Sequence, residues 1–145
     1  MRRLAAAISA SSLAAFCATM ASAVAAPDLS AYEGKYPSDA LDGVTFLAHP
    51  SVVAGVDATL ADGALQKIVL SEETVQSPIT AKDGVLRADN CEPHNCGDHN
   101  WSILIDAVSG ATEVCYHDAT STGQDESRGY LTPGETEMRP GTCFE

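Results

Sequence analysis

Four cysteines in the C-terminal part of the chain restrict its fold more than any other feature of the sequence. They stand at Cys91, Cys96, Cys115 and Cys143, and the fifth cysteine, Cys17, lies in an N-terminal segment that has the pattern of a cleaved export signal. An even number of cysteines in an exported chain indicates disulfides. Three pairings of four cysteines can be written. The short spacing of Cys91 and Cys96 favours a local bridge, which leaves Cys115 to reach Cys143. The sequence therefore predicts one disulfide that closes a small ring and a second that fixes the C-terminal end.

The first 25 residues have the three parts of an export signal. Arg2 and Arg3 give a basic start, an apolar run extends to Met20, and small residues end the segment around Ala25, which is the pattern of a secretory signal peptide. The run is shorter than the roughly 20 apolar residues of a membrane-spanning helix, and no later segment reaches that length. We predict a signal peptide over residues 1–25, a single domain over residues 26–145, a location in the periplasm or outside the cell, and no association with a membrane.

The charge of the chain restricts the class of partner. The formal net charge is −12, and removal of Arg2 and Arg3 with the signal makes it −14. Nucleic acids and anionic membrane surfaces are excluded as partners, because a phosphate backbone is bound by Lys and Arg. A basic protein is the partner that this charge favours, although acidity also serves solubility alone.

Hydrophobic spacing predicts two helices followed by a run of strands. A helix that begins at Pro50 places Val52, Val53, Val56 and Leu60 on one face, and a second helix over about 63–70, capped by Asp62, buries Leu65, Ile68 and Val69. Alternation and turn residues predict strands over 77–81, 85–89, 101–106, 112–117, 128–131 and 136–139, with a turn at 82–84. The order indicates an α+β fold: a central antiparallel β-sheet with helices packed on one face and a protruding disulfide-closed loop.

The protruding loop is the stretch Cys91-Glu92-Pro93-His94-Asn95-Cys96. Pro93 fixes a backbone angle, Asn95 tolerates turn conformations, and His94 stands at the tip. A ring held in its bound shape loses little conformational entropy on docking, so the loop fits a binding role; a stapled turn with an incidental histidine is the other interpretation.

Zinc binding is a competing interpretation of the same residues. Cys91, His94, Cys96 and His99 are four potential ligands within nine residues. Structural zinc sites usually take their ligands in two pairs from separate segments, and thiols outside the cytosol are more often oxidised than bound to metal. We therefore expect no metal and no cofactor.

The loop closely resembles the Cys-x-Pro-His-x-Cys loop of the Ivy family, the bacterial periplasmic inhibitors of vertebrate (c-type) lysozyme. The resemblance implies that the loop enters the cleft of lysozyme and that His94 hydrogen-bonds the catalytic carboxylates, while Cys91 and Cys96 close the ring and Pro93 shapes it. Asp98 and His99 would lie at the rim, and His99 also fits the first position of a strand. The best-known form of the family relies on the loop bridge alone, so Cys115 and Cys143 are a departure.

Enzymatic activity is not expected, because the sequence contains neither a nucleophile elbow nor a glycine-rich phosphate loop. The resemblance implies c-type lysozyme as the partner. Alternatively, the chain is a periplasmic binding or stress module that uses the same loop for another protein, such as a lytic transglycosylase, or for a metal. Members of the family can be dimeric, so a homodimer is left open.

Overall fold

The computed structural model describes residues 26, 28–132 and 135–144; the predicted signal segment lies outside them. Within the described residues the elements are a 3-10 helix, η1 (Leu29–Tyr32), two α-helices, α1 (Pro50–Thr59) and α2 (Gly63–Val69), and seven strands, β1 (Val75–Gln76), β2 (Thr80–Lys82), β3 (Val85–Cys91), β4 (His99–Asp106), β5 (Thr112–Asp118), β6 (Glu126–Thr132) and β7 (Glu135–Pro140). No helix of this described part is long and apolar enough to cross a membrane.

Both predicted helices form, and their first turns explain where they begin. Pro50 occupies the first turn of α1, where a backbone N–H would have no partner inside the helix. The preceding His49 accepts a hydrogen bond at Nδ1 from the Ser51 N–H (3.2 Å). Asp62 caps α2 as predicted, because its carboxylate accepts a hydrogen bond from the Ala64 N–H (2.8 Å).

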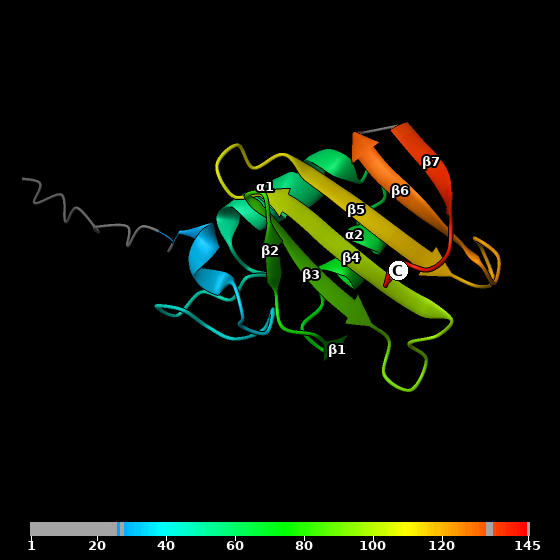
Figure 1. The fold of residues 1–145 in the computed structure, drawn as a ribbon, viewed down its shortest axis with the longest axis horizontal. Helices are drawn as coiled ribbons and strands as arrows, with labels where there is room; N and C mark the ends of the chain where they lie inside the picture. The colour runs from blue at the N-terminus through cyan, green and yellow to red at the C-terminus, as the bar shows by residue number, and fades with distance from the viewer. Residues whose placement is uncertain (1–25, 27, 133–134, 145) are drawn as a thin grey trace, which may run out of the picture.

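The strands form an antiparallel sheet in the order β1-β3-β4-β5-β6-β7, with β2 also paired to β3 (Figure 1). The two predicted hairpins and the two tail strands are present, and most of the strands are longer than expected. β3 continues to Cys91, the first residue of the predicted loop, and β4 begins at His99, shortly after its last residue, Cys96. The turn between β2 and β3 consists of Asp83 and Gly84, which both have positive φ (53° and 84°), as in a two-residue type I′ hairpin.

The strand predicted over 77–81 is confirmed only at its end: residues 80 and 81 belong to β2, whereas residues 77–79 are not in a strand. The structure has two short strands instead, β1 before this segment and β2 at its end, and both pair with β3. Pro78 lies between them and has no N–H to contribute to a strand ladder. The next residue, Ile79, donates its N–H to the carbonyl oxygen of Lys35 (2.8 Å). The edge is interrupted because its backbone bonds to the N-terminal segment there.

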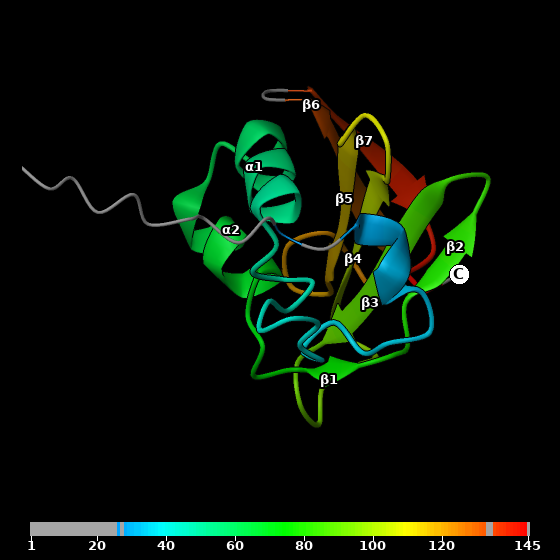
Figure 2. The ribbon, with the colours of Figure 1, turned by 90° about the vertical axis from the view of Figure 1, so that its left-hand side faces the viewer.

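The core lies between the helices and one face of the sheet. Figure 2 shows α1 and α2 on the same side of the sheet. Alternate residues of the central strands point into this core, and they are buried together with the apolar faces of the helices: Leu86, Ala88, Trp101, Ile103, Ile105 and Val114 from strands, and Val52, Val56, Leu65 and Val69 from helices. Such burial is the main source of stability in a domain of this size.

Gly55 lets α1 approach β5 closely. A Cβ at this position would lie 2.0 Å from the Thr112 Oγ1, so no other residue fits without a shift of α1 or of Thr112. The Thr59 hydroxyl lies 2.8 Å from the carbonyl oxygen of Gly55 and 3.1 Å from that of Thr112. The helix and the strand are therefore joined by a polar contact as well as by packing.

Candidate functional site

The predicted loop is the connection between β3 and β4, and it extends beyond the ends of both strands (Figure 1). Cys91, the last residue of β3, pairs in register with Asn100 of β4. The Cys91–Cys96 disulfide closes the ring, with 4.9 Å between the two Cα atoms. Because the sulfur atoms are joined to each other, neither is a thiolate ligand for a metal. Among the described residues no group of three or more His, Cys, Asp and Glu side chains is placed to hold a metal ion.

Backbone hydrogen bonds fix the shape of the ring. The Asn95 N–H donates to the carbonyl oxygen of Glu92 (3.0 Å), and the His99 N–H donates to that of Asn95 (2.8 Å). The Glu92 N–H in turn donates to the carbonyl oxygen of His99 (3.1 Å). The backbone therefore turns tightly at both ends of the ring. The disulfide alone would close the ring but would not fix these turns.

His94 occupies the turn of the ring in a left-handed backbone conformation, with φ of 66°. Histidine is among the few residues other than glycine that are enriched in this region. The side chains of Pro93 and His94 are exposed, and within the described residues His94 forms no hydrogen bond or ion pair. Both ring nitrogens of His94 are therefore available to a partner, one as a donor and one as an acceptor when the imidazole is neutral.

The Glu92 carboxylate is held within the loop. Its Oε2 accepts a hydrogen bond from Asn95 Nδ2 (2.7 Å) and lies 3.1 Å from His99 Nδ1. These hydrogen bonds, first that of Asn95 and then that of His99, lower the pKa of Glu92 below its usual range. Glu92 therefore stays ionised and contributes to the shape of the loop as well as to its charge.

His99 connects this carboxylate to the sheet. It is the first residue of β4, its Nε2 lies 2.8 Å from the hydroxyl oxygen of Tyr116, and its ring contacts those of Trp101 and Tyr116 (centroids 5.2 and 5.4 Å apart). Burial is the main cause that raises the pKa of Tyr116 to about 12. The Tyr116 hydroxyl therefore stays protonated and can donate a hydrogen bond to His99 Nε2. A proton on His99 Nδ1 then forms a hydrogen bond to Glu92 Oε2. His99 thus supports the base of the loop.

The remaining predicted rim residue, Asp98, follows the ring. Its side chain is exposed. Its N–H donates to the carbonyl oxygen of Asn95 (3.1 Å), and its own carbonyl oxygen accepts from the Ala119 N–H (2.8 Å). The backbone of Asp98 therefore attaches the end of the loop to the segment after β5, while its carboxylate faces the solvent.

Asn100 and Tyr116 also belong to the site, and the sequence did not identify Asn100 at all. Asn100 is 1% exposed, and its Nδ2 donates to the carbonyl oxygen of Cys96 (2.8 Å). The sequence feature that could have identified Asn100 is its position just after the loop and next to the apolar residues of a predicted strand. That position is common for polar residues at the ends of strands, so it does not indicate a role by itself.

Comparison with known protein families gives a match. A family model described as Inhibitor of vertebrate lysozyme (Ivy) matches residues 56–132, which is more than half of the chain and includes the whole loop. No curated protein and no solved structure matches significantly. The chain belongs to the Ivy family of inhibitors of vertebrate lysozyme.

Proposed function

We propose that this protein inhibits c-type lysozyme by inserting the Cys91–Cys96 loop into the active-site cleft, where His94 binds the catalytic carboxylates. Family membership implies lysozyme inhibition and lysozyme as the partner. The observation that supports this mechanism is the exposed imidazole of His94, without a partner of its own in the described structure, on a ring closed by a disulfide and by backbone hydrogen bonds.

The chemistry of the target suits an imidazole. Lysozyme acts through two carboxyl groups, one protonated and one ionised, on either side of the scissile bond. Neutral imidazole can accept a hydrogen bond from the first and donate one to the second, and imidazolium can donate to both if they are ionised. Because the ring of this loop is already closed, little conformational entropy is lost on docking.

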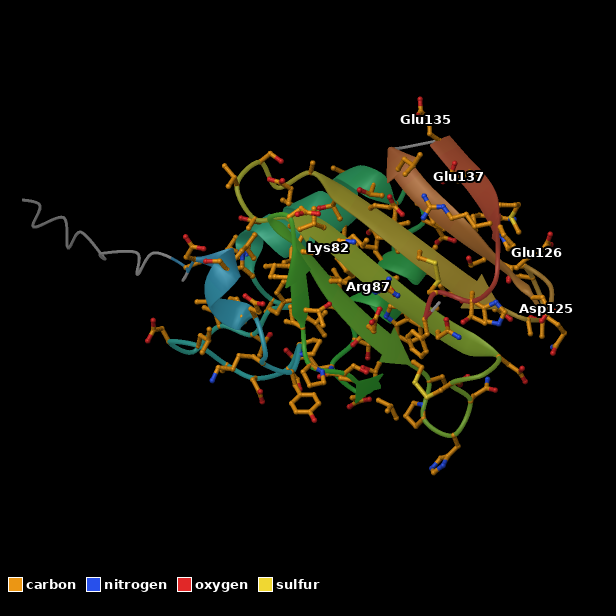
Figure 3. The ribbon with its side chains drawn as sticks, in the orientation of Figure 1. Lys82, Arg87, Asp125, Glu126, Glu135 and Glu137 are labelled. Carbon is orange, nitrogen blue, oxygen red and sulfur yellow. A yellow bond between two sulfur atoms is a disulfide. The ribbon has the colours of Figure 1, made fainter. Side chains whose placement is uncertain are left out.

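The charge of the inhibitor supports fast association. The chain carries a formal net charge of −12 before any cleavage, and lysozyme is a basic protein. Figure 3 shows Asp125, Glu126, Glu135 and Glu137 around β6 and β7, whereas Lys82 and Arg87 lie on β2 and β3. Opposite charges steer association and increase its rate, and salt screens this effect. The association rate with lysozyme is therefore expected to fall as ionic strength rises, with little change in the dissociation rate.

The proposed function includes a location outside the cytoplasm. Two disulfides hold the described structure, and structural disulfides persist in oxidising compartments. The predicted signal peptide at 1–25 supports export to the periplasm or the medium, where the protein would meet lysozyme.

The test is the activity of c-type lysozyme on a cell-wall substrate, with the purified, oxidised protein titrated in at near-physiological salt. Stoichiometric inhibition is expected. His94→Ala should raise the inhibition constant by about 30-fold or more, as for a central interface residue whose loss costs at least 2 kcal/mol. Asp98→Asn is the matched control in the same loop, and it should change the constant by no more than about threefold, as for a charge at the rim.

His99→Ala separates the tip from its support. Because His99 acts through Glu92 and Tyr116, its loss should weaken inhibition far less than the loss of His94. Equal losses from the two variants would contradict the assignment of His94 to the tip. No inhibition at large excess of the wild-type protein would contradict the proposed function itself.

A further inference from the structure

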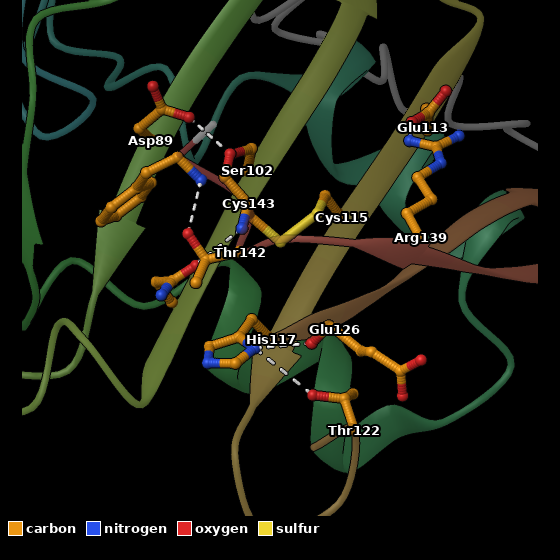
Figure 4. The surroundings of a disulfide bond; sticks show 12 residues. Asp89, Ser102, Glu113, Cys115, His117, Thr122, Glu126, Arg139, Thr142 and Cys143 are labelled. Carbon is orange, nitrogen blue, oxygen red and sulfur yellow. Dashed lines mark hydrogen bonds and ion pairs between the residues drawn. A yellow bond between two sulfur atoms is a disulfide. The ribbon is translucent and has the colours of Figure 1, made fainter. Parts of the chain in front are cut away.

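The C-terminal residues 141–144, here called the C-terminal strap, cross one face of the sheet after β7. Cys143 is joined to Cys115 of β5, with 5.7 Å between the Cα atoms (Figure 4). The carbonyl oxygen of Cys143 accepts a hydrogen bond from the Arg87 guanidinium and lies 3.1 Å from the Ser102 hydroxyl oxygen, which also donates to Asp89 Oδ1. Strands β3, β4 and β5 therefore all hold the strap.

The N–H of Cys143 has a different partner, and that partner leads to the loop. It donates to Asn100 Oδ1 (3.1 Å), while Asn100 Nδ2 donates to the carbonyl oxygen of Cys96 (2.8 Å). Both ends of one buried carboxamide are thus used, one on the strap and one on the residue that closes the ring. Residues 96 and 143 are far apart in the sequence, and this single side chain joins their backbones.

We propose that Asn100 is a positioning residue, which transmits the restraint of the Cys115–Cys143 disulfide to the inhibitory loop. This inference rests on the function proposed above, because it concerns how the loop is held ready for lysozyme. The Cys91–Cys96 bridge fixes the size of the ring but not its orientation on the sheet. Cys91 is anchored in β3, whereas Cys96 lies outside any strand. On that side of the ring the Asn100 hydrogen bond to the Cys96 carbonyl oxygen adds to the backbone bonds of Asn95 and Asp98.

The strap is what keeps the Asn100 carboxamide in this orientation. An amide whose oxygen is bound to the Cys143 N–H must direct its NH₂ group the opposite way, toward Cys96. Among the described residues the Cys143 N–H is the donor to Asn100 Oδ1, so without the strap the carboxamide could turn or bind water. The family match ends at residue 132, before the strap, so the match does not account for this connection.

The experiment uses Asn100→Asp in the full mature protein. The substitution preserves an acceptor for the Cys143 N–H but replaces the donor to Cys96 by a second oxygen. Backbone hydrogen exchange is then measured in the unbound protein at Asn95, Asp98 and His99, whose N–H groups are hydrogen-bonded within the loop. Exchange at these amides is expected to accelerate by about tenfold, because local opening becomes easier. Exchange at the core amide of Ile103 should change only as much as the free energy of global unfolding does.

Ser102→Ala is the matched control. It removes the hydroxyl that bonds to Asp89 Oδ1 and contacts the carbonyl oxygen of Cys143 and touches no loop residue, so loop exchange should stay within about twofold of wild type. The double variant Cys115→Ser/Cys143→Ser should accelerate loop exchange as Asn100→Asp does, and it decides the question if Asn100→Asp fails to fold. Unchanged loop exchange in the variants that fold would overturn the inference.

Lysozyme binding gives the second readout. Faster loop opening should appear as a dissociation rate increased several-fold, with the association rate nearly unchanged, since the charges that steer encounter lie elsewhere. Exchange is measured without lysozyme, so the inference about Asn100 stands or falls independently of inhibition. If His94→Ala leaves inhibition intact while Asn100→Asp loosens the loop, the proposed function fails and the positioning role does not.

Discussion

Replacing Cys115 and Cys143 together by serine is expected to destabilise the fold more than replacing Cys91 and Cys96, but to impair inhibition less. The sequence separations are 28 and 5 residues. In the chain-entropy model a bridge restrains the unfolded chain more as its loop lengthens, which gives about 3.5 kcal/mol for the long bridge and about 2 kcal/mol for the short one. Loss of the strap would also weaken its hydrogen bonds to β3 and β4, at roughly 1 kcal/mol each.

Urea unfolding of the two double-serine variants and of the oxidised wild type would measure this difference. With a slope of roughly 1.5 kcal/mol per molar urea, the midpoint should fall by about 2 M without the long bridge and by about 1 M without the short one. Lysozyme inhibition should rank the variants in the opposite order, because only the short bridge closes the ring around His94. An equal or greater loss of stability without the short bridge would refute the reasoning from loop length.

Three further outcomes are expected. Gly55→Ala should destabilise the fold by about 1–3 kcal/mol in thermal or urea unfolding, because the new methyl group would overlap Thr112; an unchanged stability would show that α1 can shift at no cost. Asn95→Ala should raise the pKa of Glu92 toward its ordinary value in an NMR titration, since the Asn95 hydrogen bond is the first cause of the lowering. Folding lowers this pKa, so the stability that Glu92 contributes is present above the ordinary value near 4.5 and is lost as pH falls through the lower folded value; a titration identical to wild type would contradict this. One tyrosine should ionise only near pH 12 in an ultraviolet titration, and Tyr116→Phe should abolish that step; its persistence in the variant would assign it to another tyrosine.

Local spacing was enough to predict much of this protein. Pro50 and Asp62 mark the starts of the two helices, the alternation of apolar residues gives the strands, and the short spacing of Cys91 and Cys96 gives the ring. These features depend on residues close together in the chain, so sequence patterns carry them. The strand expected over 77–81 forms only at its end, because Ile79 bonds to Lys35, a contact from outside the local segment.

Contacts between distant segments were decided by the tertiary structure. Alternation shows that Asn100 and Trp101 face opposite sides of β4, but not that the strap lies over Asn100 or that Tyr116 reaches His99. Those contacts require the register of β4 with β5 and the path of the chain after β7, which depend on packing of the whole sheet. The sequence by itself therefore determined that the chain has a closed loop with His94 at its turn. Only the fold decided what holds that loop in place, because the supporting groups come from strands and a terminal segment far from it in the chain.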